Sequence, residues 1–353
     1  MIRKAAASTL LVLLVSSPAW AYVHRESVEK TIPVEGRSAI RISNPNGLIQ
    51  LRPGVGAEIR LEAKKIAKAK GEDAARDLAE EAKVRIVEGS DEIEIRVEIP
   101  SRLKHSTGLG ELLGFSKRKQ VTVEIYVEIP ASMEVILSTA SGDVDVEGVL
   151  SGGEINATSG TVWISDCKGD FVVGVASGDV EIEGIVGELS LSASSGELSV
   201  KDISGSVQVS AASGDFIGRG ISESFSHDGA SGNVTLEDCG GEIDINTASG
   251  DIWLKNVISD ISVNTSNGDV TAFAIDGGPV NVEISCSSGD IELTVARGGS
   301  YRLEVSSVSG AIYTKVPLSV ERVTRHELSG DVGSGAGSVT LSTSSGDIKV
   351  YES

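Results

Sequence analysis

The sequence predicts an all-β protein, a parallel β-solenoid of 18-residue coils that follows a mostly-β N-terminal region with one short helix. Glycine recurs every 18 residues at Gly142, Gly160, Gly178, Gly196, Gly214, Gly232, Gly250 and Gly268. Around each of these glycines, apolar and polar residues alternate with a period of two, which indicates short strands with one buried face. Aromatic residues make up 4% of the chain and glycine numbers 41, a composition that suits thin repeating strands.

Aligned on the recurring glycine, the repeats form columns that we expect to stack from coil to coil. The position two residues after the glycine is apolar, as in Val180, Leu198 and Phe216. Later copies of the turn are expected at Gly289, Gly310, Gly330 and Gly346, where small insertions loosen the period. Repeats with one apolar face must stack to build a shared interior. At about 4.8 Å per coil, about eleven or twelve coils would form a rod roughly 55 Å long.

Residues 1–21 have the features of a secretory signal peptide. Arg3 and Lys4 give a basic start, an apolar run follows, and Ala19-Trp20-Ala21 forms an A-x-A cleavage site. The apolar run is too short to cross a bilayer, and no later stretch reaches the roughly 18 apolar residues that a membrane span needs. We therefore expect an exported protein with no membrane span, in the periplasm or at the cell surface or outside the cell.

Residues 22–135 lack the strict period and are predicted to form a β-rich capping region. Strands are expected at 28–34, 39–43, 48–51, 58–63, 92–99 and 121–129. The segment from Glu72 to Val84 is the one good helix, with acidic residues at its start. The turn Asn44-Pro45-Asn46-Gly47 and the apolar residues after it look like an early, irregular copy of the repeat. The solenoid domain is expected at 136–353.

These motifs resemble a known bacterial family. The Asn-Pro-Asn-Gly turn, a strand–helix–strand segment and a strand ending at Ile129-Pro130-Ala131 are followed by tandem Ser-Gly-Asp-Val/Ile repeats. In this order they are similar to the domain-of-unknown-function family of exported proteins catalogued as putative adhesins, and the likeness covers nearly the whole chain after the signal peptide. It implies the solenoid fold, an exported location and no catalytic residues.

The balance of charge argues against two classes of partner. Lys and Arg number 31 and Asp and Glu number 51, which gives a formal net charge of −20. Nucleic acid and anionic lipid both require basic surface, so neither is expected as a partner. The acidity permits cations or basic partners, and its ordinary role is to keep an exported protein soluble.

The residue after the turn glycine is usually acidic, as in Asp143, Asp179, Asp215, Asp251, Asp269, Asp290 and Asp347. A stacked row of carboxylates could hold calcium. However, the chain lacks the Gly-Gly-x-Gly-x-Asp pattern of calcium-binding repeat rolls. We therefore expect these side chains to bond the turn backbone, with weak cation binding as the alternative.

The cysteines and histidines do not form a predicted metal site. Cys167 and Cys239 share one inward column but lie four coils apart, about 19 Å, whereas a disulfide needs Cα atoms within roughly 7 Å. Cys286 falls in a different column, so all three are expected to be buried and free. His227 stands in an apolar column, where we expect a locally distorted coil because Gly218-Arg219-Gly220 disturbs the same turn. No cofactor and no metal are predicted.

Two outward columns are candidate binding surfaces. The column three residues after the glycine contains Trp163, Trp253 and Tyr313, whose rings could stack on sugars. It has no tight acidic pair, so a polysaccharide-cleaving β-helix enzyme is the less favoured reading and no catalytic residue is predicted. The column four before the glycine is small and polar, a hydrogen-bonding ladder that could also be a flat binding face: Asn156, Ser192, Ser210, Asn246, Asn264, Ser285, Ser306 and Ser342.

These features predict a non-enzymatic exported envelope protein, an adhesin-like binding or scaffolding rod whose partner is an unidentified envelope protein or glycan. The segment from Gly346 to Ser353 is a regular repeat strand at the end of the chain. An uncapped sheet edge is a template for pairing. The alternative is therefore a structural protein that self-associates end to end through an uncapped C-terminal coil.

Overall fold

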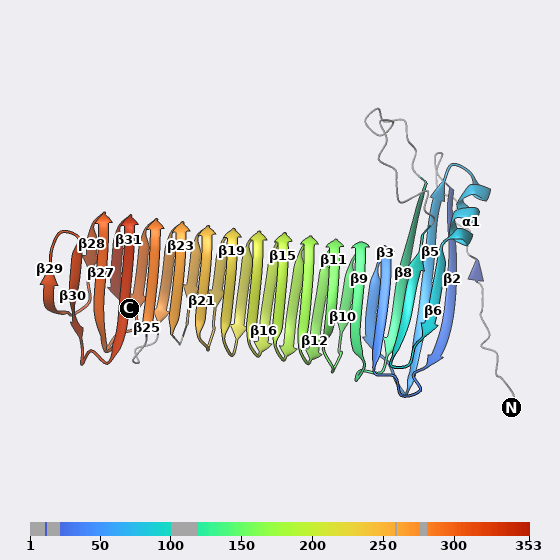
Figure 1. Cartoon of the computed structure of the whole chain (residues 1–353), viewed down its shortest axis with the longest axis horizontal. Coiled ribbons are helices and arrows are strands. Elements are labelled where there is room, and N and C mark those ends of the chain that lie inside the picture. Colours follow the sequence, from blue (N-terminus) through green and yellow to red (C-terminus); the bar gives the residue numbers. More distant parts are fainter. Residues whose placement is uncertain (1–10, 13–21, 100–118, 258–259, 276–280) are drawn as a thin grey trace. The chain divides into compact units, whose positions relative to one another are not determined.

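The computed structural model describes residues 11–12, 22–99, 119–257, 260–275 and 281–353. The chain forms two compact units, Met1–Asp170 and Phe171–Ser353, coloured blue to green and green to red in Figure 1. The predicted signal peptide lies outside the described residues except for the strand β1 (Leu11–Val12). Within the described residues, the longest apolar helix falls short of what a membrane crossing requires.

The first unit is built from eleven further strands and one helix. They are β2 (Tyr22–Pro33), β3 (Ala39–Asn46), β4 (Ile49–Pro53), β5 (Glu58–Ala69), α1 (Glu72–Glu81), β6 (Lys83–Glu88), β7 (Glu92–Glu98), β8 (Gln120–Ile129), β9 (Glu134–Ser141), β10 (Val144–Glu147), β11 (Gly153–Ser159) and β12 (Val162–Lys168). One sheet of this unit has the order β2-β5-β8-β4-β10-β12, and the other has the order β11-β9-β3-β7-β6.

Each coil consists of one strand from each sheet joined by a turn. The first coil, β3–β4, precedes the part of the chain in which glycine recurs every 18 residues. It pairs in parallel with β9–β10 on one side and with β7–β8 on the other. A Cβ atom at Gly142 would lie 1.9 Å from the Gly47 carbonyl oxygen, so the two turn glycines stack directly. The prediction that Asn44–Leu51 contains an early copy of the repeat is confirmed, although the boundary between residues 135 and 136 stays a prediction.

Antiparallel strands and a helix complete the first unit. Strands β5 and β2 pair antiparallel beyond β8, and β6 pairs antiparallel with β7. The helix α1 buries Ala75, Leu78 and Ala79. It ends at Glu81 and not at Val84 as predicted, because the chain from Lys83 onward forms ladder hydrogen bonds with β7.

The second unit begins with seven coils in sequence order. Their strands are β13 (Phe171–Ser177), β14 (Val180–Val186), β15 (Leu189–Ser195), β16 (Leu198–Ser204), β17 (Val207–Ser213), β18 (Phe216–Ile221), β19 (Phe225–Ser231), β20 (Val234–Glu237), β21 (Ile243–Ser249), β22 (Ile252–Lys255), β23 (Ile261–Asn267), β24 (Val270–Ile275), β25 (Asn281–Ser288) and β26 (Ile291–Val295). The odd-numbered strands form one parallel sheet and the even-numbered strands form another, as the alternating ribbons in Figure 1 show.

The predicted columns are confirmed in this unit. Val180, Leu198 and Phe216 are direct register partners on neighbouring strands, and each is at most 1% exposed. At the turn, Gly232 has φ +123°, and an added Cβ would lie 2.0 Å from the Gly214 carbonyl oxygen. Glycine is required there both for the backbone conformation and for the close approach of the next coil.

The last part of the second unit departs from sequence order. Six strands follow β26: β27 (Tyr301–Ser309), β28 (Ile312–Thr314), β29 (Ser319–Val323), β30 (Glu327–Val332), β31 (Gly337–Ser345) and β32 (Ile348–Glu352). The coil β31–β32 lies between coil β25–β26 and coil β27–β28 and pairs in parallel with both. Strands β30 and β29 then extend the β27 edge antiparallel.

Two predictions about this region are therefore wrong. The C-terminal coil is not an uncapped end, because β32 is hydrogen-bonded to β26 on one side and to β28 on the other. Gly330 is not a turn glycine but lies within β30, opposite Leu303 and Val320. The spacing of glycines predicted a coil turn at Gly330, where the chain instead forms the antiparallel pair β29–β30.

Candidate functional site

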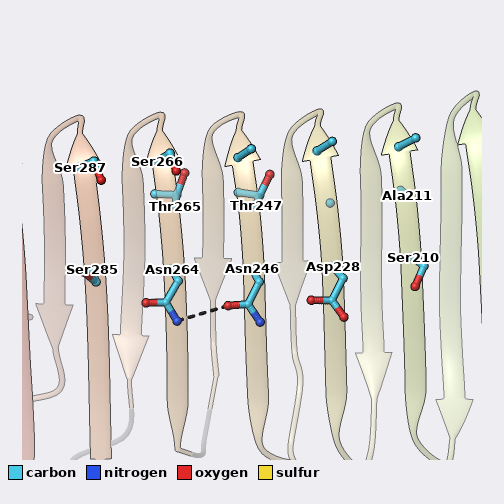
Figure 2. A pocket seen from close by; sticks show the side chains of 14 residues that line it. Ser210, Ala211, Asp228, Asn246, Thr247, Asn264, Thr265, Ser266, Ser285 and Ser287 are labelled. Atoms are coloured by element: carbon cyan, nitrogen blue, oxygen red, sulfur yellow. Dashed lines mark hydrogen bonds between the residues drawn. The ribbon is translucent and has the colours of Figure 1, made fainter.

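A groove lies on the outer face of the odd-numbered sheet in the second unit. Its volume is about 740 Å³, and it crosses strands β17, β19, β21, β23 and β25. Figure 2 shows that its side chains come from successive strands at matching heights, with a polar row including Ser210, Asp228, Asn246 and Asn264 along one side. We call this groove and its lining the polar groove.

The polar row is held by the parallel register. Ser210, Asp228, Asn246, Asn264 and Ser285 are register partners on consecutive strands. Asn264 Nδ2 donates a hydrogen bond to Asn246 Oδ1 at 3.3 Å, as drawn in Figure 2. The row therefore presents hydroxyl, carboxylate and amide groups at the spacing of the coils, about 4.8 Å.

The groove is hollow because its other residues are small. The second row, two positions further along each strand, consists of Ala212, Ala230, Ala248, Ser266 and Ser287. Between the two rows, Gly229 replaces the alanine or threonine found on the neighbouring strands. Among the described lining residues Asp228 carries the only charge, so this surface suits a neutral ligand rich in hydrogen-bonding groups.

His227 lies on the interior side of β19, next to the groove residues Asp228 and Gly229. Its side chain is 3% exposed, and its ring stacks against Phe216 and Phe225 with centroid distances of 6.0 and 6.4 Å. An added Cβ at Gly229 would lie 2.8 Å from His227 Nε2, so the absent side chain makes room for the imidazole. Burial lowers the pKa of His227, and Nδ1 has no hydrogen-bond partner.

The expected distortion at His227 is wrong. The register continues without a shift from Val209 through His227 to Ile245. Gly218 contributes space on the opposite sheet, where an added Cβ would lie 2.8 Å from the Phe216 ring. Two missing side chains thus compensate for three large rings, and the backbone stays regular.

The acidic side chains that follow the turn glycines accept hydrogen bonds from backbone N–H groups, as predicted. Asp215 Oδ1 accepts a hydrogen bond from the Asn233 N–H at 2.8 Å, and Asn233 Oδ1 accepts one from the Asp251 N–H at 2.9 Å. The same contact recurs from Asp179, Asp251, Asp269, Asp290 and Asp347 to the next coil in space. Among the described residues, no group of three or more His, Cys, Asp or Glu is arranged to hold a metal ion.

The predicted aromatic residues lie outside the polar groove. Trp253 on β22 and Tyr313 on β28 are 46% and 54% exposed on the outer face of the even-numbered sheet, and Trp163 is on β12 of the first unit. Trp253 packs edge-on against Phe273 with ring centroids 5.6 Å apart. In the second unit, four register steps separate Trp253 from Tyr313, so they do not form one site. Their binding role stays a prediction.

The three cysteines are free and buried, as predicted. Burial raises the pKa of the Cys239 thiol to about 11, and it raises the pKa of Cys167 and Cys286 in the same direction. Thiols in this state act as small apolar core residues.

The groove was partly visible in the sequence. The ladder residues Ser210, Asn246, Asn264 and Ser285 belong to the polar column proposed as a binding face. Asp228 and Gly229 were not predicted as part of this face, because they depart from the column consensus. That joint departure on one strand, β19, is the signal in the sequence that marks them.

Stacked two-strand coils, glycine turns and antiparallel end strands define a β-solenoid repeat protein. Within that class, the chain belongs to the Toastrack DUF4097 family, a family of unknown function, whose model matches residues 38–237 and 187–351. The family resemblance inferred from the Asn-Pro-Asn-Gly and Ser-Gly-Asp motifs is thereby confirmed. No curated protein matches the chain.

Three solved structures are similar to the chain at low sequence identity. A putative lipid binding protein from Parabacteroides distasonis is 15% identical, with a TM-score of 0.36, over 92% of this chain and 96% of that one. A putative adhesin from Bacteroides fragilis is 11% identical, with a TM-score of 0.26, over 92% and 96%. A putative cell adhesion protein from Clostridium sporogenes is 10% identical, with a TM-score of 0.22, over 93% and 100%. Similarities this low say nothing about a shared ligand.

Proposed function

We propose that the chain is a non-enzymatic, exported binding protein of the bacterial cell envelope, and that its polar groove holds a neutral glycan. The observation that carries the proposal is the in-register row of hydroxyl and amide groups, with the Asp228 carboxylate as its one charge among the described lining residues, along an open groove of about 740 Å³. Sugars present hydroxyl groups at regular intervals, and a coil repeat of about 4.8 Å offers them a regular set of partners.

The charge of the groove supports a neutral ligand. Asp228 is the only charged side chain among the described lining residues, so an anionic polymer would find no basic partner there. The net charge of −20 makes such a polymer less favourable still.

The chemistry near the groove supports binding without turnover. Canonical glycoside hydrolysis uses two carboxylates about 5 to 9.5 Å apart. Of the described groove residues Asp228 alone has a carboxylate, and His227 faces the apolar interior. A polysaccharide-active enzyme is therefore the weaker proposal for this surface.

The test is to fill the groove and to compare the same substitution elsewhere in the same column. Ala230→Trp places a large side chain in the groove, whereas Ala176→Trp places it at the equivalent exposed position of β13, which does not line the groove. Each variant and the unaltered protein are probed on an array of bacterial surface glycans, followed by calorimetric titration with the glycan retained best. We expect Ala230→Trp to lose binding and Ala176→Trp to keep it.

One further variant tests the polar row itself. Asn264→Ala removes one amide and its hydrogen bond to Asn246. We expect the binding free energy for the glycan to weaken by about 1 kcal/mol, which raises Kd roughly fivefold. The proposal fails if no glycan is retained by the unaltered protein, or if the two tryptophan variants bind equally well.

A further inference from the structure

The coil β31–β32, which we call the inserted coil, occupies a position that two earlier parts of the chain leave open. The chain leaves coil β25–β26 and enters β27 one coil position further on. The space between them, which we call the slot, is then filled by the inserted coil. Val339 on β31 is the register partner of Val282 on one side and of Leu303 on the other.

The slot binds the inserted coil on both sides through contacts of the ordinary repeat. The Asp347 N–H donates to Asp290 Oδ1, and the Ala311 N–H donates to Asp347 Oδ1, both at 2.8 Å. Thr343 Oγ1 donates to the Gly289 carbonyl at 3.2 Å. The four inward apolar side chains, Val339, Leu341, Ile348 and Val350, are fully buried.

The inserted coil is attached to the rest of the fold by a short, exposed connection. Residues 333–336 lead from β30 across the end of β27 to β31, and Gly333 and Gly335 adopt φ values of +63° and +70°. The connection is held mainly by Ser300, whose Oγ accepts hydrogen bonds from the Ser334 and Ala336 N–H groups at 3.0 and 3.3 Å. Once the ladder bonds of β31 and β32 to their neighbours open, straightening this connection would let the two strands move out of the slot together.

We propose that the inserted coil is exchangeable, and that two copies of this chain associate by each donating its inserted coil to the slot of the other. Each of these slot contacts is reproduced when the coil comes from a second identical chain, because the contacts depend on the coil's sequence and not on its connection. Exchange of an identical element is a low-cost route to a dimer, and a short connecting loop favours it. The partner is therefore a second copy of this chain.

The test uses cysteine pairs across the edge of the slot. Ser342 Oγ donates to Ser285 Oγ at 3.2 Å on neighbouring strands, so cysteines at these positions lie within reach of a disulfide. A full-length Ser285→Cys chain and a size-tagged full-length Ser342→Cys chain are mixed in urea, refolded together at high concentration and oxidised. Exchange places one engineered cysteine of each chain side by side, so we expect a covalent heterodimer in a denaturing gel.

The matched control uses the same substitutions within the regular stack. Ser192 and Ser210 are register partners on β15 and β17, which are joined in sequence order and leave no slot. Chains carrying Ser192→Cys and Ser210→Cys are mixed and treated identically, and we expect several-fold less heterodimer. A single chain with both Ser285→Cys and Ser342→Cys should form an internal disulfide, which verifies the register. If that internal disulfide forms but the mixed 285 and 342 chains give no more heterodimer than the control pair, the exchange is excluded.

Discussion

At the level of single residues, the side chains that follow the turn glycines act as caps for the next coil. Asp215 accepts a hydrogen bond from the Asn233 backbone, and Asn233 performs the same role for Asp251 with an amide oxygen. The contact therefore needs an acceptor oxygen at this position but not a negative charge. This is the reason why asparagine can replace aspartate in the row.

Replacing Asp215 tests this role. Asp215→Ala leaves the Asn233 N–H without its acceptor, and we expect a loss of about 1 kcal/mol of unfolding free energy, as for the loss of a helix N-cap. Asp215→Asn keeps the acceptor and should unfold at nearly the same urea concentration as the unaltered protein. Equal destabilisation by both variants would show that charge, and not the hydrogen bond, is what matters.

His227 should make the protein sensitive to acid. Its pKa is lowered by burial from an ordinary value of 6.5, so the unfolded chain takes up a proton that the folded chain excludes. The contribution of His227 to the free energy of unfolding is fully present above the unfolded-state pKa. Below that pKa it falls by at most about 1.4 kcal/mol per pH unit, until the pH reaches the lowered pKa of the folded state. We expect His227→Val to remove this acid-induced loss of stability. The measurement is the difference between the urea unfolding midpoints at pH 7.5 and pH 5, which should be smaller for the variant than for the unaltered protein.

The residue-scale predictions from sequence succeeded where a column repeats and failed where it is broken. The buried state of the cysteines and the capping by aspartates followed from their columns. The regular backbone at His227 did not, because it depends on Gly218 and Gly229, which lie on different strands and are brought beside the rings only by stacking.

At the level of the coil, the turn glycines set how closely neighbouring coils approach. A Cβ atom at Gly232 would lie 2.0 Å from the Gly214 carbonyl oxygen, and this clash is with backbone that cannot move without breaking the ladder. Only glycine, which has no side chain, therefore fits at this position of the turn.

We expect Gly232→Ala to lower the free energy of unfolding by about 3 kcal/mol or more, because the steric clash and the positive φ act together. Gly71, which precedes α1, has open space around it, so Gly71→Ser should be neutral or slightly stabilising through a new N-cap. Thermal unfolding followed by circular dichroism compares the two. A small effect of Gly232→Ala would mean that the coils can separate at the turn without loss of pairing.

Across the whole molecule, the balance of charge is strongly negative, with a net charge of −20. In the second unit the stacking order brings Asp251, Asp269, Asp290 and Asp347 into one uninterrupted row of carboxylates. Like charges at the coil spacing repel one another, and dissolved salt screens the repulsion.

We therefore expect the melting temperature to rise when NaCl is added at neutral pH. Asp269→Asn keeps the acceptor oxygen and removes one charge from the row, so it should be more stable than the unaltered protein at low salt and respond less to added salt. Calorimetric scans at low and high NaCl measure both effects. A melting temperature that falls with salt would show that the surface ion pairs outweigh the repulsion.

The repeating coil could be predicted from the sequence alone, with its length, its inward columns, its glycine turn and its capping side chains. The prediction was possible because each of these depends on residues close in the chain or one period away. The order in which strands stack at the far ends of each unit could be read only from the folded chain. Strands β7 and β8 pair with the outer side of β3 and β4, and β31–β32 enters between two earlier coils. Because most coils share one apolar pattern, the pattern alone does not select a neighbour, and the order depends on the connections and on long-range pairing.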